Sequence, residues 1–130
     1  MSKKTIGLGA TLGVISIILG AFGAHALKAV LTVEQLVSFE TGVRYQMYHA
    51  LFLLFVGIVP FLSEKQRKNI LVTTLLGVLF FSGSIYLLAT QSLSGINFKF
   101  LGPITPIGGL FLIISWCQLG FYSFRQKTDK

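Results

Sequence analysis

Charged side chains are scarce in this sequence. They make up 12% of the 130 residues, whereas a typical soluble domain carries roughly 25%. Hydrophobic residues make up 53%, and the mean hydropathy is +0.77. A soluble core of this size would not need so few charges, so the composition excludes an ordinary soluble domain. It predicts a protein of the cell membrane, built as a single domain over residues 1–130.

Acidic residues and cysteine are scarcer still. The chain has 4 Asp and Glu against 11 Lys and Arg, which gives a net charge of +7. In a soluble protein this excess would suggest nucleic acid as a partner. Here the basic residues lie between apolar runs, and no patch mixes them with exposed aromatic residues, so we expect no nucleic-acid partner. The single cysteine, Cys117, excludes an internal disulfide.

The sequence also lacks the residue groups that catalysis and cofactors require. No Asp or Glu lies within an apolar run, no nucleophile has an evident base, and the spacings of metal sites and catalytic triads are absent. The two histidines, His25 and His49, suggest a pair of haem ligands, but two histidines alone are weak support for haem. We therefore expect no enzymatic activity, no metal and no cofactor.

Four apolar runs are long enough to approach the roughly 20 residues that a bilayer requires. They are Thr5–Leu27, Tyr45–Leu62, Ile70–Thr90 and Pro103–Phe124. The second run is the shortest. Thr32 and Gln35 ahead of it have the spacing of a capping box, which predicts a short amphipathic helical lead-in along the membrane surface. The expected fold is an all-α, multi-pass membrane protein with four transmembrane helices.

The positions of the basic residues predict the orientation, because an excess of Lys and Arg stays on the cytoplasmic side. With the N-terminus inside, the outer segments hold Lys28, Arg44 and Lys99. The cytoplasmic segments then hold Lys3, Lys4, Lys65, Arg67, Lys68, Arg125, Lys127 and Lys130. Both termini are therefore predicted to lie in the cytoplasm.

The start of the chain allows a different interpretation. Lys3 and Lys4 precede an apolar run that ends at Ala24-His25-Ala26, which is the pattern of a signal peptide with its cleavage site. Cleavage there would leave three spans. The run is longer than a usual signal-peptide core and rich in glycine, which favours a helix that is retained.

Four sequence blocks are distributed over the four predicted spans. They read GAFGAHALK, FETGVRYQMYHAL, FSGSIYLLA and LGPITPIGG. These blocks resemble the signature blocks of the domain-of-unknown-function 423 family, small bacterial membrane proteins that animal transmembrane protein 256 resembles. The resemblance implies an integral membrane protein with four helices, of which the first is retained. It implies no particular biochemical activity.

Small residues are predicted to form the surfaces on which the helices pack, because membrane helices associate where backbones can approach closely. On the first span, an arc of about 100° holds Gly9, Gly13, Ser16, Gly20, Gly23 and Ala24. On the third span, an arc of about 40° holds Thr73, Gly77, Ser84 and Gln91. The polar groups of the second arc should face another helix rather than lipid. The alternative is that glycine is scattered by composition, since it is common in membrane helices.

Polar side chains gather near the predicted outer end of the first and second spans. The candidate cluster consists of His25, Glu40, Arg44, Tyr45, Tyr48 and His49. Glu40, Arg44 and Tyr48 are four residues apart and are predicted to share one face of a helix. We expect Arg44 to pair with Glu40, and His49 to turn towards His25.

Two functions remain open for this cluster. It could fasten the bundle of a non-enzymatic structural or interaction protein, which lies among membrane lipids and associates with itself or with another membrane protein. Alternatively, His25, Arg44 and His49 could bind a lipid or small ligand, or form part of an ion-conducting path, at the outer end of the bundle.

Overall fold

The computed structural model describes residues 1–126, in which all regular structure is helical. The long helices are α1 (Lys3–Ala24), α2 (Val33–Ile58), α3 (Glu64–Val78) and α6 (Ile104–Phe124). A π-helical turn, η2 (Leu79–Gly83), continues α3 into α4 (Ser84–Ala89). The connections contain the short pieces η1 (Leu27–Ala29), α5 (Gln91–Ser94) and η3 (Lys99–Leu101).

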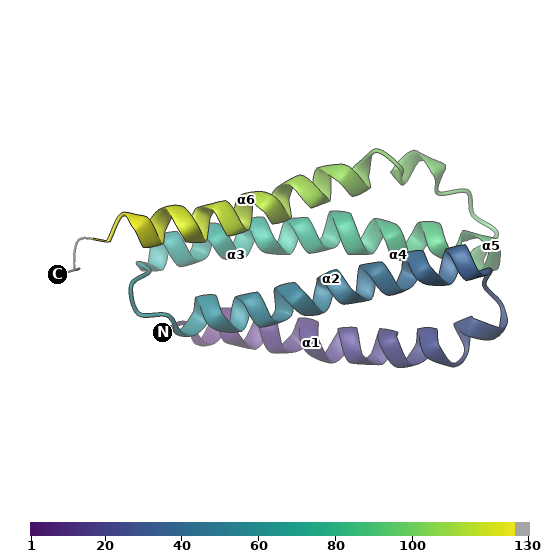
Figure 1. Ribbon diagram of the computed structural model, residues 1–130, viewed down its shortest axis with the longest axis horizontal. Coiled ribbons are helices and arrows are strands. Elements are labelled where there is room, and N and C mark those ends of the chain that lie inside the picture. Colours follow the sequence, from purple (N-terminus) through teal and green to yellow (C-terminus); the bar gives the residue numbers. More distant parts are fainter. Residues whose placement is uncertain (127–130) are drawn as a thin grey trace.

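The helices run alternately in opposite directions and follow one another across the molecule. In Figure 1 the order from top to bottom is α6, then α3 with α4, then α2, then α1. α1 packs along α2, α2 packs on α3 and α4, and α6 packs on α3 and η2. The N-terminus and the end of α6 lie at the same end of the molecule as the connection between α2 and α3 (Figure 1).

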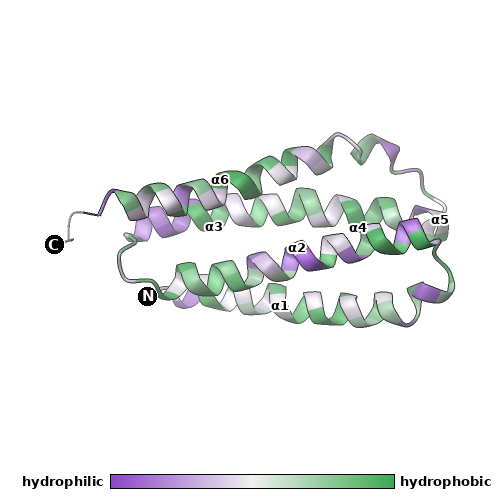
Figure 2. Ribbon diagram, viewed as in Figure 1, coloured by the Kyte–Doolittle hydropathy of each residue, from purple (hydrophilic) through white to green (hydrophobic). Residues whose placement is uncertain are grey.

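Three helical segments are long and apolar enough to cross a membrane. They are Lys3–Ala29, Glu64–Ala89 and Lys99–Phe124, and they contain most of the first, third and fourth predicted spans. α2 holds most of the second predicted span and is not one of the three, because polar residues such as Arg44, Gln46 and His49 lower its hydropathy. Figure 2 shows hydrophobic residues over most of α1 and α6, and hydrophilic residues in α2.

α2 begins with the predicted capping box. The Thr32 side chain accepts a hydrogen bond from the Gln35 backbone, and the Gln35 side chain accepts one from the Thr32 backbone. The predicted lead-in is not a separate surface element, because the helix then continues without a break to Ile58. The sequence between these points has no proline that would break the helix.

A buried arginine caps the other end of α2. Pro60 has no N–H to donate, so the carbonyl of Val56, four residues earlier, lacks its helical partner. The Arg67 guanidinium donates to that carbonyl at 2.9 Å and to the Val59 carbonyl at 2.8 Å. Arg67 is 5% exposed. It therefore joins the start of α3 to the end of α2, whereas Lys65 and Lys68 beside it are exposed.

The small-residue arc of α1 lies along α2. A Cβ atom at Gly9 would come within 2.9 Å of the Ala50 carbonyl oxygen, and one at Gly23 would come within 3.2 Å of the Phe39 ring. Gly13 and Gly20 lie on the same face with more room, since their Cβ atoms would be 3.8 Å from Ala50 and 3.5 Å from Val43. Ser16 is buried and donates to the Leu12 carbonyl, while Ala24 is exposed.

The predicted polar arc of the third span is divided between helix packing and a loop. Gly77 packs on Leu112 of α6, and Ser84 shares a hydrogen bond with Thr105 at the start of α6. Thr73 is half-buried and donates to a carbonyl of its own helix. Gln91 accepts a hydrogen bond from the Phe98 backbone and so holds the connection that follows α4.

Lys127 and Lys130, two of the basic residues on which the predicted orientation depends, lie outside the described residues.

Candidate functional site

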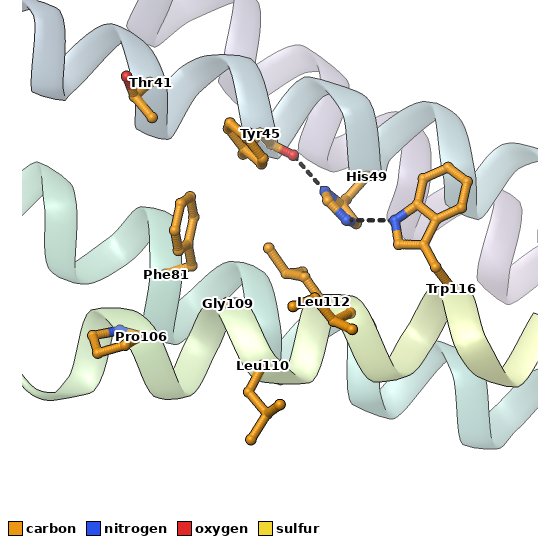
Figure 3. Close-up of a pocket in the computed structure, with 10 residues that line it drawn as sticks. Thr41, Tyr45, His49, Phe81, Pro106, Gly109, Leu110, Leu112 and Trp116 are labelled. Carbon is orange, nitrogen blue, oxygen red and sulfur yellow. Dashed lines mark hydrogen bonds between the residues drawn. The ribbon is translucent and has the colours of Figure 1, made fainter.

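A groove of about 590 Å³ lies between α2 and α6. It runs from Thr41 and Pro106 at one end to His49 and Trp116 at the other (Figure 3). Its lining residues are Thr41, Tyr45, His49, Phe81, Pro106, Gly109, Leu110, Leu112, Ile113 and Trp116. Most of these side chains are apolar or aromatic. Ligand pockets in proteins are commonly about 300–1,000 Å³ with a similar lining.

Two adjacent glycines and the π-helical turn shape this groove. A Cβ atom at Gly108 would come within 2.2 Å of the Phe81 backbone nitrogen, so α6 contacts the backbone of η2 directly at this point. Gly109, the next residue, lines the groove, and a Cβ atom there would be 3.6 Å from the Phe81 ring. The block GPITPIGG therefore contributes both to the start of α6 and to the groove. Its prolines begin α6, and its glycines allow the close approach and the open space.

A hydrogen bond between His49 and Trp116 closes one end of the groove. The Trp116 indole N–H donates to His49 Nε2 at 3.0 Å, and His49 Nδ1 lies 2.7 Å from the Tyr45 carbonyl oxygen (Figure 3). An indole nitrogen can only donate and a carbonyl can only accept. His49 is therefore neutral, with its proton on Nδ1. The Phe52 ring packs on the Trp116 ring at a tilt of 38°, with centroids 4.3 Å apart, and so helps to fix its orientation.

Apart from the Tyr45 hydroxyl, the polar side-chain groups in the groove are engaged by the protein. Both ring nitrogens of His49 are bonded as described, and the Thr41 hydroxyl donates to the Val37 carbonyl of its own helix. Tyr45 packs its ring on Phe81 and Tyr48. No group of three or more His, Cys, Asp or Glu residues that could hold a metal ion occurs within residues 1–126. The groove therefore offers an apolar surface, without an activated nucleophile.

A second set of polar contacts ties α2 to the helices on its other side. Gln46, which is 3% exposed, donates to the Leu12 carbonyl of α1 and accepts from the Tyr86 hydroxyl of α4 at 2.7 Å. Ser82 of η2 donates to the Gly42 carbonyl at 2.7 Å. These bonds hold α2 in position beside the groove, because they join three helices near the middle of the bundle.

The structure does not bring the six predicted cluster residues together. His25 follows the end of α1 and is exposed, whereas His49 is buried and directed towards Trp116 of α6. Glu40 and Arg44 are both exposed on α2, and no ion pair joins them or any other acidic and basic side chains within residues 1–126. Tyr45 lines the groove, and Tyr48 lies outside it on the exposed face of α2.

Sequence reasoning did not identify the α6 side of this site. Trp116 lies 67 residues after His49, and nothing in their spacing indicates the contact. The adjacent glycines of GPITPIGG were an available signal, since paired small residues often mark a close approach between helices. Arg67 and Gln46 were missed in the same way, because their partners lie on other helices.

This arrangement defines an all-helical integral membrane protein with a lateral groove. The chain belongs to the family described as protein of unknown function DUF423, whose family model matches residues 19–109. It is 36% identical over 128 residues to a UPF0382 membrane protein of Haemophilus influenzae, covering 98% of this chain and 99% of the relative. It is 41% identical over 122 residues to the UPF0382 membrane protein YwdK of Bacillus subtilis, covering 90% and 93%. No solved structure matches the chain. The predicted family and membrane location are confirmed.

Proposed function

We propose that the chain is a single four-span domain, residues 1–130, with both termini in the cytoplasm. The support is the pairing of α1 with α2 along nearly the whole of α1. Gly57 near the end of α2 packs on Ile6 near the start of α1, and Phe39 near the start of α2 packs on Gly23 near the end of α1. If α1 crosses the bilayer, a helix that accompanies it from end to end must cross as well.

We further propose that the protein binds an acyl chain of a membrane lipid in the groove between α2 and α6, without enzymatic activity. The observation that carries this proposal is an apolar groove of about 590 Å³ whose polar side chains are largely engaged by the protein itself. Such a surface favours a ligand that needs no hydrogen bonds along its length. Of the two functions that the sequence left open, this one follows the alternative. The proposed site keeps His49, adds Trp116, and includes neither His25 nor Arg44.

The length of the groove fits one leaflet of the bilayer. Pro106 and Trp116 are separated by about 15 Å along α6, at 1.5 Å per residue. The hydrocarbon core is about 30 Å thick, so a single leaflet accounts for about half of that. In the proposed orientation, Thr41 and Pro106 lie towards the outer surface, and the His49–Trp116 bond lies near the middle of the membrane. A lipid of the outer leaflet would place its chain in the groove and its headgroup above Thr41.

The experiment uses a phospholipid with a photoactivatable group near the end of one acyl chain. After irradiation in membranes, we expect the wild-type protein to be labelled on α2 and α6 beside His49 and Trp116. Gly109→Leu should strongly reduce this labelling, because its side chain would occupy the groove. Gly120→Leu on the same helix is the matched control, since a Cβ atom at Gly120 has no atom within 4 Å.

The outcomes separate a specific site from general contact with lipid. Loss of labelling in Gly109→Leu, with labelling retained in Gly120→Leu, would support binding of the acyl chain in the groove. Labelling spread evenly over the exposed faces of α1 and α6, and unchanged in Gly109→Leu, would contradict it.

A further inference from the structure

α2 carries an exposed stripe whose residues face away from the other helices, apart from Thr41, which also lines the edge of the groove. Its residues are spaced alternately by four and three positions, and they are Val37, Thr41, Arg44, Tyr48, Leu51 and Phe55. All are exposed except Thr41, which is half-buried. This spacing is the one by which two helices pack along a left-handed seam.

Two opposite charges lie at membrane depth, with Arg44 on this stripe and Glu40 at its edge, one residue before Thr41. Arg44 is about 21 Å from Ile58 along the helix axis, whereas the hydrocarbon core is about 30 Å thick. Glu40 lies one turn closer to the outer surface. Both side chains are exposed, and neither has an ion-pair partner in the part of the chain that the structure describes. Charged groups that face lipid are costly and usually pair with one another.

We propose that α2 packs against α2 of a second copy of this chain, with Arg44 of each copy bound to Glu40 of the other. Copies in one membrane share their orientation, so the two helices are parallel. A two-fold axis between them then brings each Arg44 to the other copy's Glu40, because a symmetric interface repeats every contact twice. This proposal depends on α2 crossing the membrane and is independent of what occupies the groove.

The apolar part of the stripe continues the same interface. Tyr48, Leu51 and Phe55 follow Arg44 towards the cytoplasmic end and are each about half exposed. They would extend the contact between the two helices below the charged pairs. The opposite side of α2 is already covered by α1 and by α3 with α4, so a second copy can approach from the stripe without disturbing the bundle.

The first test is cysteine cross-linking in native membranes. Cys117 is exposed, so each variant carries Cys117→Ser. We expect Leu51→Cys to form a disulfide-linked dimer on oxidation, and Ile18→Cys, which is exposed on α1, to remain monomeric. Equal cross-linking of both variants, or cross-linking of Ile18→Cys alone, would overturn the proposed interface.

The second test separates pairing between copies from pairing within one helix. Glu40→Lys alone and Arg44→Glu alone each place like charges across the seam, whereas a mixture of the two variants restores both opposite-charge pairs. Each variant is produced in two forms that carry different tags, and capture through one tag measures association with copies that carry the other. We expect at least a tenfold gain in co-purification when the two tags are on different variants, compared with both tags on the same variant. If the mixture behaves as the separate variants do, the charges do not pair between copies.

Discussion

His49 illustrates at the scale of the residue how a polar side chain is accommodated between membrane helices. Its two ring nitrogens bond to Trp116 and to the Tyr45 carbonyl, and the side chain is 3% exposed. The imidazole therefore acts as a fixed neutral bridge between α2 and α6. If the Trp116 donor is removed, the buried His49 Nε2 atom has no hydrogen-bond partner. This costs more stability than replacing both partners by apolar side chains.

Trp116→Phe should destabilise the protein by about 1–3 kcal/mol, because it removes the donor and keeps the aromatic contact with Phe52. The double change His49→Phe with Trp116→Phe should cost less than the sum of the single changes, since the pair acts as a unit. Thermal unfolding in mild detergent measures both. Strictly additive effects would mean that the hydrogen bond does not couple the two helices.

The glycines of α1 show at the scale of the element how two helices are held at a short distance. Gly9 contacts the backbone of α2, while Gly7, two residues earlier on the same helix, has no atom within 4 Å of its Cβ position. The two positions share their chemistry and differ in packing. The difference in stability between alanine variants at these two positions therefore measures the close approach of the two helices rather than helix propensity.

Gly9→Ala should lower the thermal stability by several degrees, because its Cβ would meet the Ala50 carbonyl oxygen at 2.9 Å. Gly7→Ala should leave stability unchanged or raise it slightly, since alanine favours a helix by about 1 kcal/mol over glycine. Melting temperatures of both variants, measured in the same detergent, provide the comparison. Equal losses would remove the case for a packing surface on this face.

The elements were more predictable than the site. Apolar length and the capping box at Thr32 and Gln35 indicated the long helices and the start of α2, because these signals are local. The π-helical turn and the contact of Gly108 with Phe81 depend on how α6 meets η2, and no local pattern contains that information. Of the predicted cluster, Tyr45 and His49 line the groove, whereas the partner Trp116 could not be predicted from spacing.

At the scale of the whole molecule, both proposals depend on one feature, which is that α2 crosses the membrane beside α1. The groove would lie within a leaflet, and the α2 stripe could meet a second copy, only in that arrangement. Three exposed positions report on it: Lys28 before α2, Lys65 after it, and Asn97 between α4 and α6. A helix that stayed on the membrane surface would leave Lys28 and Lys65 on the same side.

The most direct measurement is labelling of intact cells with a membrane-impermeant thiol reagent, using Lys28→Cys, Lys65→Cys and Asn97→Cys singly, each with Cys117→Ser. We expect labelling at positions 28 and 97 and none at 65 until the cells are permeabilised. This result would place α2 across the bilayer with both termini in the cytoplasm. Labelling at both 28 and 65 on intact cells would show that α2 does not cross, and would contradict the account.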